Sequence, residues 1–357
     1  ISDEQLTKDI RKYSVYAWVS PEHKVRIVKA WQANGEVVAM TGDGVNDSPA
    51  LKTSDIGCAM GKVGTEVAKE AADVILTDDN FATIVSAVEE GRRIYDNILK
   101  VIQFLISCNV GEVIVLLLAT LFAPAIASWF GISDVTMIQV LLPIHILWIN
   151  LVTDTFPALA LAFDPANKDV MNRKPIKKDD GIFTKGRTFR IIYQGVMIGL
   201  LTLIAFLIGL ATPDDKLPTM ISYENQVISA EEIDNLDEVL ANGGEYISKE
   251  EIKIEIGQTM VFIVLAFSEL VHVFNIRDNK NSIFKTGILG NPILIWAVLF
   301  SAFLMVIILT VPALRHVFSI PILPLGNMIE VMELLLAPIA IVELLKLPVS
   351  IEDEIKN

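Results

Sequence analysis

The chain has 357 residues, of which 52% are hydrophobic, and its mean hydropathy of +0.51 is too high for an ordinary soluble protein. Its formal net charge of -14 excludes nucleic acid as a partner, because phosphate backbones are bound by clustered Lys and Arg. With only Cys58 and Cys108, one in a polar region and one in an apolar run, we expect neither a disulfide framework nor a cysteine-based metal site. The composition therefore predicts membrane spans, with the lipid bilayer as the main partner.

Residues 1–90 are predicted to form a soluble α/β region. Amphipathic patterns predict helices at Glu22–Ala33 and Val63–Ala72, and short apolar runs predict strands at Val37–Met40, Ile56–Met60 and Val74–Leu76. Strands that alternate with helices indicate a parallel sheet. Since the chain starts on a polar stretch, without an initiator Met or a signal peptide, we expect it to be a fragment of a longer protein.

The first predicted strand runs into an acidic turn bracketed by Gly42 and Gly44. Side chains at the carboxyl end of a parallel strand face the edge where α/β folds bind ligands. Asp43 and Asp47 can offer oxygen ligands to Mg2+, and Lys24 can offer a positive charge to a phosphoryl oxygen. A turn of this kind can also be a simple solvated loop, and Lys24 a solvated lysine on a helix surface.

Six apolar segments follow, most of them close to the length that crosses the hydrocarbon core. They lie at about 98–123, 138–163, 189–211, 257–276, 291–313 and 327–346. Residues 91–346 are therefore predicted to form a stalk and an all-α bundle of six transmembrane helices. Basic loops after the second and fourth spans indicate the cytoplasmic side, and the acidic loop 213–256 indicates the opposite side. This places residues 1–90 and the tail 347–357 in the cytoplasm.

Acids and other oxygen-bearing side chains interrupt three of these spans. The spacings predict that the members within each span share one helix face. They are Asn109 and Glu112 in the first span, Asn150, Thr153 and Asp154 in the second, and Glu269 in the fourth. An acid in mid-membrane costs about 2.5–3.5 kcal/mol on insertion scales, so we expect these acids to face the bundle interior and to share a cation.

The donor set predicted here contains oxygen but no sulfur or imidazole, which favours a hard cation such as Ca2+. Pro157 removes a backbone donor just after Asp154 and can loosen the helix, so that carbonyl groups also become ligands. For Asn109 or Thr153 alone, a hydrogen bond between helices is the simpler interpretation, and the same interpretation competes for Glu269. It does not account for three acids.

The motif Thr41-Gly42-Asp43-Gly44-Val45-Asn46-Asp47 resembles the hinge motif of P-type ATPases, whose phosphorylation domain has the haloacid-dehalogenase fold. The resemblance implies that Asp43 binds Mg2+, that Asn46 and Asp47 support the phosphate site with Thr41 and Gly42 beside them, and that Lys24 is the family's lysine. The family's nucleophile is the Asp of a DKTGT motif, which this sequence lacks, so we expect the chain alone to be inactive.

The membrane motifs NVGEV and NLVTD are similar to those of the calcium-transporting branch of these pumps, and the resemblance extends through the whole chain. It implies one Ca2+ site built from Asn109, Glu112, Thr153, Asp154 and Glu269, with Asn150 and Asp154 serving a second site. It also implies an aspartyl-phosphate cycle that uses ATP, bound mainly by another part of the protein, and coupled to the membrane through residues 80–100.

We therefore interpret the chain as the C-terminal part of a Ca2+-exporting pump, with protons returning on the emptied acids, in a plasma membrane. A pump for another divalent cation such as Mn2+ is the nearest alternative. Two others are a truncated, non-catalytic membrane protein and a dehalogenase-type phosphatase with membrane anchors. The last needs an Asp nucleophile that the sequence does not offer.

Overall fold

The computed structural model describes residues 1–167, 169–173, 175–176, 181–223, 226–230, 233, 235–279, 282–283 and 287–356. Some residues behind the orientation prediction lie outside this set: Lys168, Lys174, Lys177, Lys178, Lys280, Lys285, Glu224, Glu231, Glu232 and Asp234. The chain divides into two compact units, each described here by itself. The first holds Ile1–Arg93 together with Ala166–Ile182, and the second holds Ile94–Pro165 and Phe183–Asn357.

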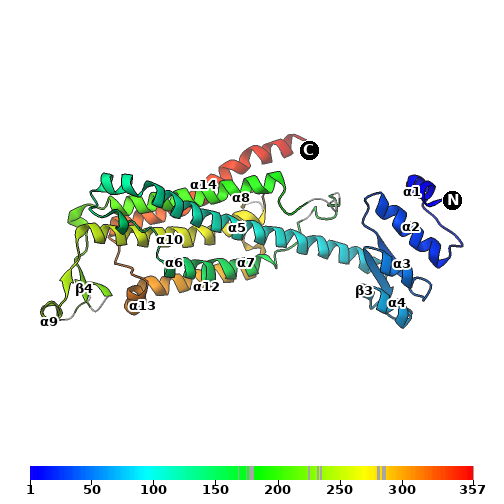
Figure 1. The fold of residues 1–357 in the computed structure, drawn as a ribbon, viewed down its shortest axis with the longest axis horizontal. Helices are drawn as coiled ribbons and strands as arrows, with labels where there is room; N and C mark the ends of the chain where they lie inside the picture. Colours follow the sequence, from blue (N-terminus) through cyan, green and yellow to red (C-terminus); the bar gives the residue numbers. More distant parts are fainter. Residues whose placement is uncertain are drawn as a thin grey trace. The chain divides into compact units, whose positions relative to one another are not determined.

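The first unit is a small α/β fold with a three-stranded parallel sheet in the order β1-β2-β3 (Figure 1). Its elements are α1 (Asp3–Asp9), α2 (Pro21–Ala33), β1 (Ala39–Gly42), α3 (Ser48–Thr53), β2 (Ile56–Met60), α4 (Glu66–Ala71) and β3 (Val74–Leu76). The core beneath the sheet contains Leu51, Ala59 and Ala68. Two predicted strands coincide with β2 and β3, whereas β1 starts two residues later than predicted and includes Gly42.

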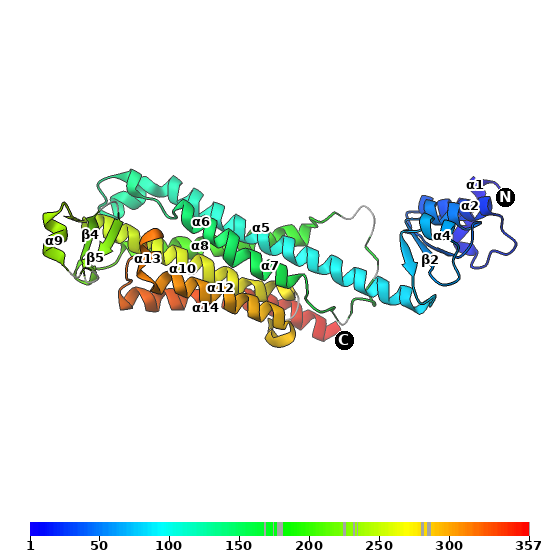
Figure 2. The same cartoon turned by 90° about the horizontal axis from the view of Figure 1, so that it is seen from below.

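The second unit is a bundle of long helices (Figures 1 and 2). They are α5 (Ala82–Phe130, which begins in the first unit), α6 (Pro143–Trp148), a π-helical segment (Ile149–Asp154), α7 (Thr155–Leu161), α8 (Lys185–Leu210), α10 (Lys249–Arg277), α12 (Pro292–Thr310), α13 (Pro312–Val317) and α14 (Leu325–Lys356). Helix α10 packs against α8 and α14, and α12 packs against α7. Most of α10 is buried, which makes it the central helix.

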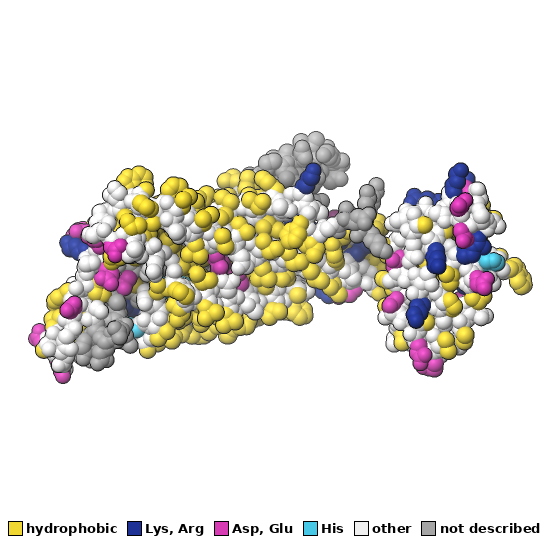
Figure 3. Space-filling model, viewed as in Figure 1, with side chains coloured by type: hydrophobic (Ala, Val, Ile, Leu, Met, Phe, Trp, Pro, Cys, Tyr) yellow, Lys and Arg dark blue, Asp and Glu magenta, His cyan; other side chains and the backbone are white. Residues whose placement is uncertain are grey.

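Among the described residues, five helical segments are long and apolar enough to cross a membrane. They are Ala82–Phe130, Pro143–Leu161, Lys185–Leu210, Lys249–Arg277 and Pro292–Thr310. The sixth predicted span lies within α14 and stays a prediction. Large apolar side chains such as Leu121, Trp296 and Phe303 are exposed on the bundle, and Figure 3 shows hydrophobic side chains spread along it. Such an apolar surface suits lipid, so this unit is a multi-pass membrane domain.

The acidic segment 213–256 is more ordered than the predicted solvated loop. It contains α9 (Leu236–Ala241) and a three-stranded antiparallel sheet in the order β5-β4-β6, made of β4 (Met220–Tyr223), β5 (Gln226–Ser229) and β6 (Glu245–Tyr246). Helix α10 already begins at Lys249, where Ser248 caps it by accepting a hydrogen bond from the Glu251 nitrogen. Asp214 binds both Lys249 and Lys253 of this helix, at 3.1 and 2.8 Å. These ion pairs therefore attach the start of the segment to α10, although its composition alone predicts a solvated loop.

Candidate cation and phosphate sites

The phosphate-handling turn lies at the carboxyl end of β1, as the sequence predicts. Asp43 is exposed there, and its backbone carbonyl accepts a hydrogen bond from the Thr65 nitrogen at 2.8 Å. Asn46 is exposed as well, while Thr41 and Gly42 are partly buried. Among the described residues, no hydrogen bond or ion pair engages the Asp43 carboxylate, so its oxygens are available to Mg2+, which prefers one or two carboxylate ligands.

Asp47 has a different position from Asp43, although both are acids of one turn. It is 8% exposed, its carboxylate forms an ion pair with Lys24 of α2, and it accepts a hydrogen bond from the Gly44 nitrogen at 3.3 Å. A side chain at Gly42 would collide with the Asp47 side chain, which explains the glycine there. The expectation that Asp47 is a direct Mg2+ ligand is therefore not supported by this arrangement. The pair instead brings a lysine to the edge of the sheet where a phosphate would lie.

In the membrane unit, the side chain of Glu112 in α5 is hydrogen-bonded to Asn150 of the π-helical segment. It is 5% exposed, and the Asn150 amide donates to its two carboxylate oxygens at 2.9 and 3.0 Å. Asn109 does not join it, contrary to the shared face that the spacing predicts. The Asn109 side chain is exposed, and its amide donates to the carbonyl of Leu105 one turn back.

The helix containing the motif NLVTD widens into a π-helical turn at Ile149–Asp154, three residues before Pro157. The missing proline donor predicts a disturbance here, and the structure confirms it. Thr153 and Asp154 are both buried in this turn, at 0% and 1% exposure. The carbonyls are not left free, because those of Ile149, Asn150 and Val152 accept hydrogen bonds from the hydroxyls of Thr153, Thr155 and Ser301.

Glu269 lies in the middle of α10 with none of its surface exposed. Neither of its carboxylate oxygens, nor either of those of Asp154, has a hydrogen-bond partner among the described residues. Glu112 interacts electrostatically with both acids. Unpartnered buried carboxylates are costly, and a bound cation is the simplest way to satisfy them. Three helices therefore bring three acids together, as the sequence predicts, and their chemistry suits a cation.

A fourth member of this cluster is a thiol that the sequence analysis left out. Cys108 of α5 is fully buried, and its sulfur and a carboxylate oxygen from each of Asp154 and Glu269 lie within 4.8 Å of one another. The predicted donor set did not include this thiol, which lies beside two of its acids. The available signal was the spacing of four between Cys108 and Glu112, which places both on one helix face. His272, one turn after Glu269, is directed elsewhere, with its Nε2 3.3 Å from the Ser107 hydroxyl.

A buried ionic network ties the helices together outside the acid cluster. Asp164, after α7, binds Lys100 of α5 at 2.7 Å and Arg277 at the end of α10 at 2.9 Å, and all three are at most 8% exposed. Asn97 donates to the Asp164 carbonyl and Asn291 to its carboxylate. Asp164 therefore joins the middle of α5, the residues after α7 and the end of α10.

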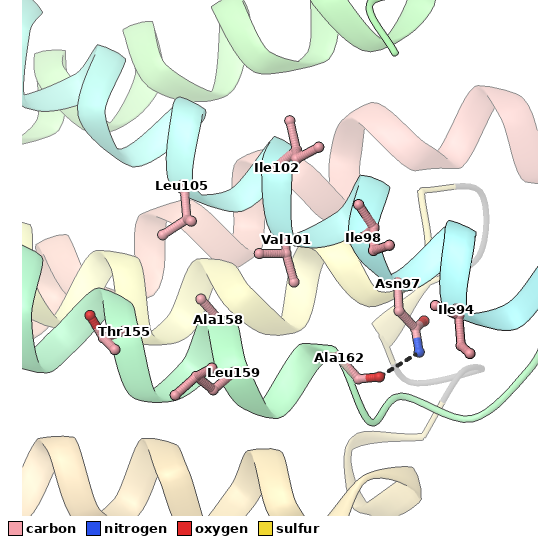
Figure 4. A pocket seen from close by; sticks show the side chains of 10 residues that line it. All are labelled: Ile94, Asn97, Ile98, Val101, Ile102, Leu105, Thr155, Ala158, Leu159 and Ala162. Atoms are coloured by element: carbon pink, nitrogen blue, oxygen red, sulfur yellow. Dashed lines mark hydrogen bonds between the residues drawn. The ribbon is translucent and has the colours of Figure 1, made fainter.

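A groove of about 390 Å3 in the bundle is a different kind of feature. It lies between α5 and α7 and is lined mainly by apolar side chains such as Ile98, Val101 and Leu159 (Figure 4). Its main polar feature is the hydrogen bond from the Asn97 amide to the Ala162 carbonyl, at 3.1 Å. Because the groove has no charged lining residue, it is not the cation site.

Comparisons with known proteins agree with this division of the chain. The family described as "Cation transporting ATPase, C-terminus" matches residues 138–347, and "haloacid dehalogenase-like hydrolase" matches residues 24–88. The chain is 46% identical over 349 residues to calcium-transporting ATPase 1 of Bacillus cereus, covering 97% of this chain and 35% of that protein.

Two further relatives are more distant. The calcium-transporting ATPase of Bacillus subtilis is 40% identical, over 89% of this chain and 30% of that protein. The endoplasmic reticulum calcium ATPase srcA of Aspergillus fumigatus is 37% identical, over 91% of this chain and 31% of that protein. The chain thus spans about a third of the length of these relatives. With a family match over more than half of its residues, joined to a dehalogenase-like unit and a membrane bundle, the chain belongs to the cation-transporting ATPase family.

Proposed function

We propose that the whole protein is an ATP-driven pump that exports Ca2+, and that this chain contributes most of its ion site and half of its phosphate site. The observation that carries the proposal is the pair of buried carboxylates of Asp154 and Glu269, which have no basic partner among the described residues and lie beside Glu112. The names of the relatives, all calcium-transporting ATPases, support Ca2+ as the cargo.

The ion site would use oxygen ligands from three helices. Ca2+ takes about 6–8 oxygens, and the acids together with Asn150 and Thr153 can supply that number. Asn109, whose side chain is turned outward, would need to rotate to take part. When the ion leaves, buried carboxylates would carry uncompensated charge, so we propose that protons replace it and return to the other side.

The phosphate site would use the turn after β1. Asp43 would hold Mg2+, which when bound neutralises charge on a transferring phosphoryl group. Lys24, positioned by Asp47, would face a phosphoryl oxygen, with Asn46, Thr41 and Gly42 around it. Because the sequence contains no DKTGT motif, we place the aspartyl nucleophile and most of the ATP site in another part of the whole protein.

The two sites would communicate along α5, a single helix of 49 residues that begins in the first unit and carries Glu112 in the second. We place the first unit and the C-terminal tail in the cytoplasm and the segment 213–256 on the opposite side, from the charges of the loops. Of the possible membranes, we propose the plasma membrane.

Uptake of radioactive Ca2+ into vesicles that contain the full-length protein tests this proposal. We expect ATP-dependent uptake that Asp154→Asn abolishes, while Asp237→Asn in the exposed helix α9 leaves it unchanged. Radioactive Mn2+ is measured in parallel. ATP-dependent uptake of Mn2+ without uptake of Ca2+ would show that the transported ion is Mn2+ and not Ca2+. No uptake of either ion by a protein that hydrolyses ATP would contradict the proposal.

A further inference from the structure

The thiol of Cys108 has the position of a ligand in the cation site proposed above, on which this inference rests. Its sulfur lies within the 4.8 Å group formed with oxygens of Asp154 and Glu269. All three side chains are at most 1% exposed. The two acids have no basic partner among the described residues; Asp154 interacts instead with Glu269 and with Cys108 itself, which places the thiol directly beside both carboxylates.

The neighbouring residue makes the assignment sharper. Asn109, which the family resemblance makes a ligand, is exposed and bonded to its own helix through Leu105. Cys108 is instead turned inward, four residues before Glu112 and on the same face of α5. Around the acids, α5 therefore presents a sulfur where the resemblance expects an amide oxygen.

Sulfur changes which ions such a site prefers. Ca2+ binds oxygen ligands, whereas thiolate selects softer divalent ions, and Zn2+ accepts thiolate and carboxylate ligands alike. Only the thiolate is a good ligand, so the thiol would lose its proton to solvent as the metal–sulfur bond forms.

We propose that Cys108 is a ligand in this site and that it allows the pump to bind sulfur-preferring divalent cations, of the class of Zn2+ and Cd2+, in addition to Ca2+. In this proposal, Ca2+ is bound by oxygen ligands alone, whereas the softer ions are bound by oxygen ligands together with the sulfur of Cys108.

Equilibrium binding to the purified full-length protein, without ATP, tests this directly. Radioactive Cd2+ and radioactive Ca2+ are measured separately on the unmodified protein, Cys108→Ser and Cys108→Ala, with Cys58→Ser in β2 as the matched control. Elution as a single species in size exclusion confirms that each variant is folded. The ultraviolet absorption of cadmium bound to thiolate is recorded as a second readout.

We expect both Cys108 variants to lose Cd2+ affinity by at least tenfold more than they lose Ca2+ affinity, and to lose the absorption band. Cys58→Ser should leave both affinities and the band unchanged. Equal Cd2+ affinity in all proteins, an equal loss of both ions in the Cys108 variants, or no band in the unmodified protein would overturn the proposal. Cd2+ binding that depends on Cys108 in a protein that binds no Ca2+ would support this inference and contradict the proposed Ca2+ transport.

Discussion

Replacing Asp164 by Asn should destabilise the membrane unit strongly, because this acid neutralises two buried cations. At an effective dielectric constant of about 20, its contacts with Lys100 at 2.7 Å and Arg277 at 2.9 Å are each worth about 6 kcal/mol before desolvation is counted. The loss of hydration cancels much of this attraction. Breaking a buried pair by removing one partner costs about 3–5 kcal/mol, which is the range we expect for Asp164→Asn.

The same geometry predicts that replacing Lys100 costs much less stability than replacing Asp164. Lys100→Met removes one cation but leaves Asp164 paired with Arg277, and it replaces a long side chain by an apolar one of similar size. We expect it to change the free energy of unfolding by no more than about 1 kcal/mol. Unfolding of the full-length protein in mixed micelles, followed against increasing sodium dodecyl sulfate, measures both changes.

An exposed pair supplies the control. Glu66 binds Lys69 at 3.0 Å with its side chain 83% exposed, so Glu66→Gln should cost less than about 0.5 kcal/mol. If Asp164→Asn behaved like this surface substitution, or if Lys100→Met were as damaging as Asp164→Asn, the view of Asp164 as the shared neutralising acid would be refuted.

Three further predictions concern other parts of the chain. Gly209→Ala should cost about 1–3 kcal/mol in the same unfolding assay, since the added carbon would lie 2.7 Å from a backbone nitrogen of α10, whereas Gly91→Ala, with open space around it, should stabilise its helix slightly. Lys24→Met should slow phosphorylation of the full-length protein by ATP by about 100-fold, and the exposed Lys29→Met on the same helix should not. Hydrogen bonds from the backbone N–H groups of residues 62 and 63 lower the pKa of Asp79 below its usual 3.8, so the stability that these bonds contribute to the first unit should be present above pH 3.8 and lost as the pH falls through the lowered pKa, and Asp79→Asn should flatten this part of the pH dependence in thermal unfolding.

Much of the first unit follows from the sequence because local patterns determine it. The strands β2 and β3 have the predicted bounds, since each is a short apolar run between turn residues. The strand β1 extends further than its apolar run, because Thr41 and Gly42 pair with Cys58 and Ala59 of the neighbouring strand. That pairing is a tertiary contact, which hydropathy does not record.

The ion site shows the limit of spacing arguments. Helical periodicity places Glu112, Asp154 and Glu269 on inward faces, and the structure buries all three. It does not distinguish Cys108 from Asn109, because neighbours on a helix differ by 100° and the neighbouring helices decide which of them faces inward.

The secondary structure within segment 213–256 was not predicted, for a related reason. Its acid Asp214 pairs with Lys249, which lies 35 residues away in the chain, so local composition does not reveal the contact.

The central claim is that buried carboxylates from three helices hold the transported cation. Equilibrium binding of Ca2+ to the purified full-length protein, without ATP, tests it most directly when the unmodified protein is compared with Glu112→Gln, Asp154→Asn and Glu269→Gln. We predict that each substitution weakens Ca2+ binding at least tenfold while the protein still elutes as a folded species. Unchanged Ca2+ affinity in all three variants would contradict the account.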